Sequence, residues 1–176
     1  MSMPSIYDHE IASYRAALAA LEIPGEGTPN LTHASLAYSN RLNLMLIGLC
    51  SLVEARLFEL AECQRSRIKL DDLKGQGVAR LKLFLSRVDA VDFGRIAEWR
   101  RFMSLYKVRN SLVHSYGGLV LESQTRKLRE ALRQLKFDNA LVGDRRIRLC
   151  SSHLDQSVGI VEAVIRGIDA AQGVLR

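Results

Sequence analysis

Three polar residues around position 110 carry side chains that together could cleave a phosphodiester bond. Arg109, Asn110 and His114 fall within six consecutive residues. An arginine can hold a phosphate through two parallel hydrogen bonds, and a histidine can take or give a proton near neutral pH. RNA supplies its own nucleophile, the 2′-hydroxyl, so this set could act on RNA without a metal ion. The histidine would transfer protons while the arginine stabilised the crowded phosphate.

The same residues interrupt the apolar pattern of a helix predicted over residues 93–114. Its two apolar stripes are each broken once at the same level, one by Asn110 and the other by Arg109. A polar side chain turned toward packed surface costs ~1–3 kcal/mol when it stays unpaired, so such positions favour a pairing role or a site. Asn110 and His114 lie four residues apart and share a face. Arg109 lies about 140° round the helix from His114 and has to reach back toward it.

Each of these residues also has an ordinary structural interpretation. A helix arginine commonly pairs with a carboxylate, and a histidine at a helix end commonly caps the helix or faces solvent. The attacking hydroxyl must lose a proton and the leaving 5′-oxygen must gain one. One histidine and one arginine suffice in kind for this reaction, but two histidines would serve better. A two-fold dimer would supply a second Arg–His pair.

Consecutive amphipathic helices are predicted to position this segment. The chain has no proline after residue 29, which permits long helices. A helix that is apolar nearly all round from Leu42 to Leu60 is expected at the centre. Its Glu54 and Arg56 are interpreted as partly exposed, and the alternative is a buried ion pair or a role in orienting the motif. The pattern favours an all-α, up-and-down bundle of about five to six helices, one domain over residues 1–176, with a short β-hairpin before the last helix. The helices are expected over residues 7–21, about 30–67, 78–88, 93–114 and 122–135 and from Ser151 or Ser152 onward, with the hairpin within 140–149 and a capping box at Ser152 and Asp155.

Positive charge is concentrated in the second half of the chain. The 176 residues carry a formal net charge of +6 at pH 7, and residues 93–148 contain 13 basic and 5 acidic side chains. This concentration favours a polyanionic partner, RNA first. Arg100, Arg101 and Lys107 on the motif helix are the RNA-binding candidates. The basic side chains that could extend their track are Arg126, Lys127, Arg129, Arg133, Arg145, Arg146 and Arg148.

The composition argues against several other classes of protein. The hydrophobic share of 48% and the charged share of 25% are typical of a globular protein. The four histidines and three cysteines lack zinc-ligand spacing, so no metal or other cofactor is expected, and the cysteines are interpreted as buried, reduced thiols. The longest apolar run, residues 42–53, falls short of the ~20 residues that span a bilayer, and no signal-peptide pattern is visible. We therefore expect a cytoplasmic protein with no membrane partner.

The segment Arg109–Tyr116, RNSLVHSY, resembles the signature of HEPN-domain proteins. That signature is Arg-x4–6-His, often with Asn, Asp or His directly after the arginine, and the predicted long helix, hairpin and final helix resemble the layout of this helical family. The resemblance implies a homodimer whose motif helices meet at the two-fold axis and which cleaves RNA without a metal, leaving a 2′,3′-cyclic phosphate and a 5′-hydroxyl. Arg109 and His114 would be catalytic, with Asn110 as polar support. Many members are toxins of toxin–antitoxin or phage-defence systems.

Tyr116, two residues after His114, matches the narrower Arg-x4-His-x-Tyr pattern of one branch of this family. In that branch a small nucleotidyltransferase antitoxin adds AMP to the tyrosine and silences the toxin. The resemblance thus implies Tyr116 as an AMPylation candidate and a nucleotidyltransferase as a partner. The structural alternative is a tyrosine that packs at the helix end before two glycines.

Three functions stay open on the sequence. A toxin-like endoribonuclease is favoured. The alternatives are a non-catalytic HEPN module that binds RNA or a protein partner, and a bundle subunit that binds nucleotide or polynucleotide for a partner enzyme. The sequence does not single out tRNA, mRNA or rRNA as the target, because a site for a phosphate and a 2′-hydroxyl is indifferent to the base.

Overall fold

The computed structural model describes residues 5–64, 66–115, 118–143 and 145–174; for residues 173 and 174 it describes the backbone only. It confirms the predicted all-α bundle with a short hairpin before the last helix. A single turn of 3-10 helix, Leu70–Asp72, precedes α3. The elements are α1 (Ile6–Ala19), α2 (Leu31–Cys63), α3 (Gly77–Val88), α4 (Trp99–Val113), α5 (Glu122–Leu135), β1 (Leu141–Val142), β2 (Arg146–Ile147) and α6 (Ser151–Val174).

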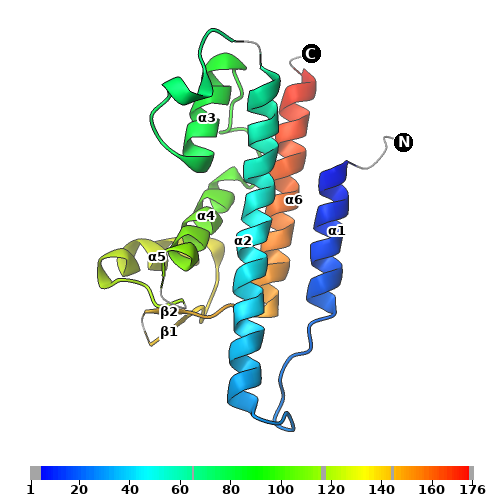
Figure 1. The fold of residues 1–176 in the computed structure, drawn as a ribbon, viewed down its shortest axis with the longest axis vertical. Helices are drawn as coiled ribbons and strands as arrows, with labels where there is room; N and C mark the ends of the chain where they lie inside the picture. Colours follow the sequence, from blue (N-terminus) through cyan, green and yellow to red (C-terminus); the bar gives the residue numbers. More distant parts are fainter. Residues whose placement is uncertain (1–4, 65, 116–117, 144, 175–176) are drawn as a thin grey trace.

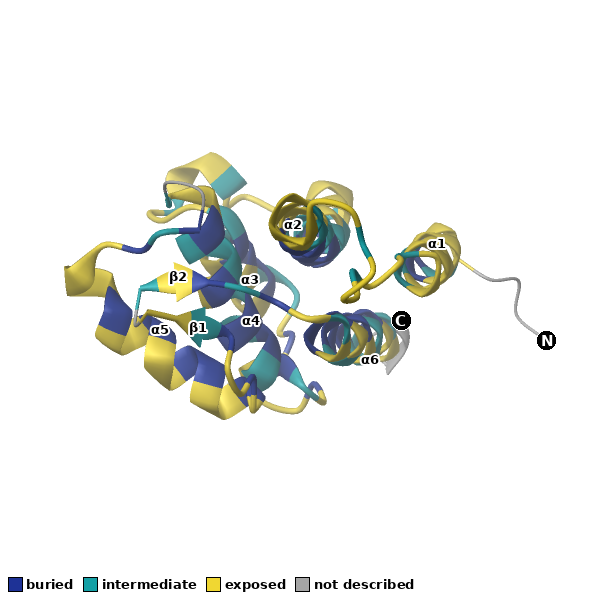
Figure 2. Ribbon diagram, turned by 90° about the horizontal axis from the view of Figure 1, so that it is seen from below, coloured by how far each residue is buried: buried dark blue, intermediate teal, exposed yellow. Residues whose placement is uncertain are grey.

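Two long helices, α2 and α6, stand side by side and form the axis of the molecule (Figure 1). Helix α1 packs along α6 on one side, whereas α3, α4 and α5 lie on the other side. Helix α4 contacts α2, α5 and α6, so it is enclosed by neighbours along much of its length. The antiparallel hairpin pairs Leu141 with Ile147 and Val142 with Arg146 beside α5. Figure 2, viewed along the long axis, shows α1 at one edge and α5 at the opposite one.

Helix α2 is the central element that its apolar composition predicts. Leu42, Leu46, Leu49 and Leu57 are fully buried against the neighbouring helices. The burial is less uniform than expected, because Leu44 is 68% exposed. Phe58, 14 residues further on and on the same face of the helix, is 44% exposed. One face of α2 therefore leaves large apolar side chains uncovered.

Three predicted helix boundaries are wrong. The motif helix begins at Trp99 rather than at residue 93, because Asp92 starts a turn in which its side chain accepts a hydrogen bond from the Gly94 backbone (2.9 Å). Helix α2 ends at Cys63 rather than near residue 67, because the backbone becomes extended at Gln64. The Gln64 side-chain amide donates a hydrogen bond to the carboxylate of Asp89, just after α3. Helix α1 ends at Ala19, so residue 21 lies in the following loop.

The last helix begins at Ser151, as predicted, but Ser152 and Asp155 do not cap it. Instead, the backbone N–H of Cys150 donates a hydrogen bond to Nδ1 of His153 (3.3 Å). His153 is buried, and its ring stacks on Phe137 at a centroid distance of 4.6 Å. Burial lowers the pKa of His153, and a hydrogen bond with the Asp138 backbone opposes that shift. A neutral imidazole thus fits both the contact with Cys150 and the apolar setting.

We expect the free energy of unfolding to decrease as the pH falls below about 6.5, the ordinary pKa of histidine. Below that pH the His153 imidazole is protonated in the unfolded chain, whereas burial keeps it neutral in the folded protein. The stability that neutral His153 contributes is fully present above this pKa and is lost as the pH falls through the lower pKa of the folded state. Urea unfolding on each side of pH 6.5 measures it. His153→Gln should reduce the pH dependence, while His33→Gln, at an exposed position, should leave it as in wild type. An equal pH dependence in wild type and His153→Gln would contradict the assignment.

The cysteines differ from the expectation of buried thiols. Cys50 on α2 is fully buried, and burial raises its pKa to about 12. Cys63 and Cys150 are exposed. Within the described ranges, none of the helices has the length and apolarity needed to cross a bilayer.

Candidate functional site

The predicted motif lies at the C-terminal end of α4. Val108 and Leu112 are buried and anchor this last part of the helix in the core. Arg109 and Asn110, which lie between these two residues in the sequence, are half-buried. His114 caps the helix, is exposed, and donates its backbone N–H to the Asn110 carbonyl (3.0 Å). The helix thus presents two half-buried polar groups followed by an exposed imidazole.

The Arg109 side chain turns toward α2. Its Nη1 donates a hydrogen bond to Oδ1 of Asn110 (2.9 Å), and its Nη2 lies 4.0 Å from a carboxylate oxygen of Glu54. The guanidinium carbon lies 5.4 Å from the centre of the Tyr106 ring, one turn earlier on α4. Within the described part of the chain, the buried Nε has no hydrogen-bond partner. A partly exposed ion pair contributes at most ~1 kcal/mol, so these contacts fix the direction of Arg109 more than they stabilise the fold.

Glu54 is the acidic centre of this cluster. Both of its carboxylate oxygens lie 3.4 Å from the Tyr106 hydroxyl. Burial, followed by the charge of Glu54, raises the pKa of Tyr106. The alternative pair of Glu54 with Arg56 does not form, because Arg56 turns to Asp169 on α6 (2.7 Å). Both side chains are partly exposed, the interpretation favoured for them, and Glu54 lies beside Arg109 and Tyr106 of the motif helix.

Gly77, the first residue of α3, makes room for the cluster. Its φ of +54° lies in the left-handed region. A Cβ at this position would lie 2.6 Å from the Tyr106 hydroxyl and 2.8 Å from Oε1 of Glu54. Any larger residue therefore has to displace the two side chains that hold Arg109.

We expect Gly77→Ala to destabilise the protein more than Gly143→Ala does. Gly143, in the hairpin turn, has almost the same φ of +55°, but nothing lies within 4 Å of a Cβ added there. Both variants incur ~1–2 kcal/mol of backbone strain. Gly77→Ala should cost about 1 kcal/mol more, because it breaks the contact of Tyr106 with Glu54. Urea denaturation gives the difference, and equal losses in the two variants would contradict it.

His114 lies on the opposite side of the motif, in a shallow pocket between α4 and α5. The pocket has a volume of about 270 Å³. Asn110 lines it together with His114, so the amide that accepts from Arg109 also reaches the surface on which His114 lies. Arg109 itself is not part of the lining, and in the described residues no hydrogen bond or ion pair joins it to His114. One chain thus brings Arg109 to Asn110 and Asn110 to His114, but not Arg109 to His114.

The three RNA-binding candidates on α4 occupy different settings. Arg100 is exposed. Arg101 is half-buried and forms an ion pair with Glu98 one turn earlier (2.7 Å). Lys107 is exposed on the rim of the His114 pocket. The AMPylation candidate Tyr116 lies outside the described residues.

A second open groove lies between α5 and the hairpin. It measures about 660 Å³, and four of the six described residues that line it are arginines: Arg126, Arg129, Arg133 and Arg145. The first three recur at intervals of three and four along α5 and so share a face. Arg145 reaches the groove from the hairpin, where its Nε donates to the Val120 carbonyl (3.1 Å). The basic track predicted from composition thus gathers in part on one surface.

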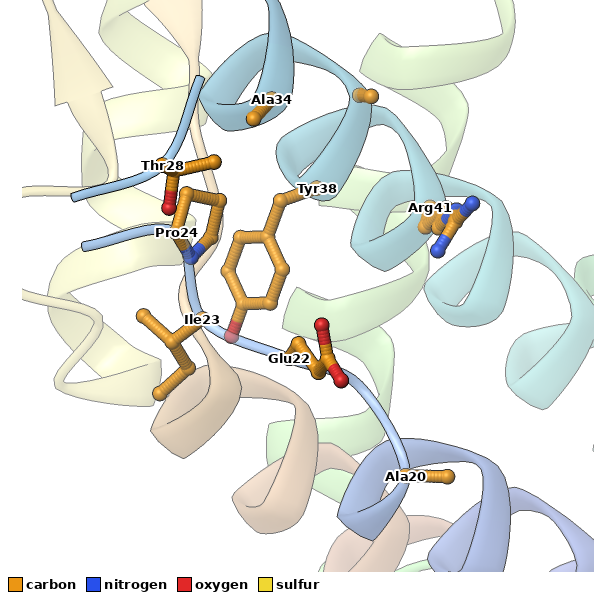
Figure 3. A pocket seen from close by; sticks show the side chains of 9 residues that line it. Ala20, Glu22, Ile23, Pro24, Thr28, Ala34, Tyr38 and Arg41 are labelled. Carbon is orange, nitrogen blue, oxygen red and sulfur yellow. The ribbon is translucent and has the colours of Figure 1, made fainter. Parts of the chain in front are cut away.

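A third hollow lies far from the motif, where the loop after α1 meets the first turns of α2 (Figure 3). Its volume is about 350 Å³. Tyr38 extends from α2 toward the loop beside Pro24, and most of the other lining side chains are small or apolar. This hollow lacks the Arg–His combination, so it is a weaker candidate for chemistry than the end of α4.

No family model, curated protein or solved structure matches this chain. Its function has to be inferred from the chemistry of the site.

Proposed function

We propose that this protein is a metal-independent endoribonuclease with a toxin-like action, whose reactive centre is shared by two copies of the chain. The observation that carries the proposal is the end of α4, where a half-buried arginine bonded to Asn110 is followed by an exposed histidine at a pocket. These are a fixed cation and a proton carrier, the two kinds of group that 2′-hydroxyl attack requires. The alternative, a non-catalytic HEPN module that binds RNA or a protein partner, needs neither.

The proposed reaction is an internal transfer at phosphorus. Neutral His114 of one chain takes the 2′-hydroxyl proton as the O2′–P bond forms. The partner's His114, in its protonated form, gives a proton to the 5′-oxygen as the P–O5′ bond breaks. Arg109 stabilises the negative charge that develops on the phosphate oxygens. The products are a 2′,3′-cyclic phosphate and a 5′-hydroxyl end.

The division of the motif within one chain supports a shared centre. Arg109 is directed toward Glu54 on α2, while His114 lies in the pocket between α4 and α5. One chain therefore offers a single histidine and an arginine turned away from it. A second copy would add the missing imidazole and a further guanidinium.

Exposed apolar side chains support dimer formation near the motif. Val113, next to His114, is 45% exposed at the end of α4. Phe58 is exposed on α2 and lines a shallow pocket together with Glu54. Large apolar groups beside a polar cluster are typical of a surface that another chain covers.

The direct test is cleavage of an RNA oligonucleotide by the purified protein in the presence of a chelator. We expect fragments with a 2′,3′-cyclic phosphate and a 5′-hydroxyl, identified by mass spectrometry. The same oligonucleotide with a 2′-deoxyribose before the cleaved phosphate should remain intact, because it lacks the nucleophile. Cleavage of the deoxy-substituted bond, or an intact all-RNA substrate, would contradict the proposal.

RNA binding is expected to weaken steeply with salt because the arginine groove contacts phosphates. The logarithm of the binding constant falls by about 0.7 per neutralised phosphate for each unit of log salt on a single strand. The variant Arg126→Gln/Arg133→Gln should lower this slope by about 1–1.5 in a fluorescence-anisotropy titration. The control Arg41→Gln/Arg87→Gln removes equal charge from α2 and α3 and should keep the wild-type slope. Equal slopes in the two double variants would show that the groove does not contact the RNA.

We further propose, from the resemblance to the Arg-x4-His-x-Tyr branch, that AMP transfer to Tyr116 silences the nuclease. A bulky anion two residues beyond His114 would repel RNA from the site. Mass spectrometry after co-expression with a nucleotidyltransferase antitoxin should find the added AMP on Tyr116. Suppressed toxicity with an unmodified Tyr116 would rule this mode out.

A further inference from the structure

The pocket that contains His114 has a composition unlike that of the arginine groove. Residues from α4 form one wall and residues from α5 form the other. At about 270 Å³ it lies just below the usual ~300–1,000 Å³ of small-molecule sites, a size that suits one heterocycle better than a large cofactor. The lining residues are Lys107, Asn110, Ser111 and His114 of α4 with Gln124, Lys127 and Leu128 of α5.

The chemistry of these side chains fits a base joined to phosphates. Leu128, only 1% exposed, supplies an apolar floor. The amides of Asn110 and Gln124 each carry a donor and an acceptor, as the edges of nucleobases do. Lys107 and Lys127 are exposed and line the pocket, so they can meet the negative charge of phosphates joined to a bound base.

Gln124 is the group in this pocket best able to read a base edge. The Asn110 oxygen already accepts from Arg109, and the Ser111 hydroxyl already donates to the Lys107 carbonyl (3.1 Å). The Gln124 side chain, in contrast, is exposed and has no hydrogen-bond partner among the described residues. Its donor and acceptor are both available, and the proposed reaction gives it no other task.

We propose that the pocket between α4 and α5 binds the nucleobase next to the cleaved phosphate and that Gln124 selects that base. The inference rests on the proposed nuclease function, since His114 in the same pocket is the group placed at the phosphate. A base seated over Leu128 would bring its own ribose and phosphate toward His114. The base preference of the nuclease would then originate in α5, outside the Arg–His motif.

The test is a calorimetric titration of the full-length protein with each of the four nucleoside 3′-monophosphates. We expect one nucleotide to bind at least about tenfold more tightly than the weakest, since a side-chain amide paired with a base edge discriminates by about this factor. Gln124→Ala should remove that preference. Ser123→Ala, an exposed position on the same turn of α5 but outside the pocket, should keep it.

The outcomes separate this inference from the nuclease proposal. Four equal affinities in wild type, or a preference that survives in Gln124→Ala, would overturn the base-selecting role even if RNA is cleaved. Selective binding that depends on Gln124, in a protein that leaves RNA intact, would support the pocket and overturn the nuclease. As a second readout, Gln124→Ala should broaden the bases found at cleavage sites in a randomised RNA, whereas Ser123→Ala should not.

Discussion

Replacing His114 with alanine is expected to lower the rate of RNA cleavage by about 10²–10⁴-fold, the usual contribution of a general acid–base group. The imidazole is exposed at the end of α4, and His114 is the only histidine among the described residues that line its pocket. Its loss leaves the 2′-hydroxyl without a base and the 5′-oxygen without an acid. Because the side chain is exposed, the fold should be little affected, and circular dichroism should confirm this.

The measurement combines initial cleavage rates with cell growth after induction. Arg109→Ala should also lose activity, because it removes the guanidinium that stabilises the phosphate, and no other cation is bonded to Asn110 among the described residues. His33→Ala is the matched control, an exposed histidine on α2 outside every proposed site. Toxicity and cleavage that persist unchanged in both His114→Ala and Arg109→Ala would refute the catalytic role. They would favour the non-catalytic module, in which Arg109 only pairs with Glu54.

Phe102→Ala is expected to lower the free energy of unfolding by about 3–5 kcal/mol, enough to leave much of the protein unfolded. Phe102 is fully buried on α4, with the rings of Trp99 and Tyr106 at centroid distances of 5.5 and 6.0 Å. Its removal leaves a cavity in the helix that holds the motif. It also frees Tyr106, on which Arg109 lies.

Urea denaturation followed by tryptophan fluorescence measures this loss. Ile23→Ala is the control, because that side chain is 69% exposed in the loop after α1 and should cost less than about 1 kcal/mol. The same loss in both variants would mean that α4 is not packed as described.

The periodicity of apolar residues was sufficient to predict the helices, because the apolar face of an amphipathic helix is stable only when it is buried against neighbouring elements. It predicted α3 and α5 to within a residue. It failed at the start of α4, where Ile96 continues the stripe through a turn. An apolar residue in a turn can be buried as fully as one in a helix, so the pattern alone cannot separate the two.

The candidate site was only partly predictable. The spacing placed Arg109 and His114 on different sides of the helix, as observed. The expectation that Arg109 reaches back toward His114 is wrong within one chain, because its guanidinium turns to Asn110 and Glu54. Tyr106, three residues before Arg109, could have been recognised from helical spacing as its aromatic partner. Gln124 and Gly77 could not, since they reach the site from other helices through packing that local sequence does not encode.

The shared reactive centre is tested most directly by a mixed dimer of one wild-type chain and one His114→Ala chain, purified through two different tags. If both histidines serve one centre, this dimer should cleave RNA at least about tenfold more slowly than wild type. A mixed dimer carrying His33→Ala instead should retain full activity. A His114→Ala mixed dimer with about half the wild-type rate would mean that each chain works alone and would contradict the account.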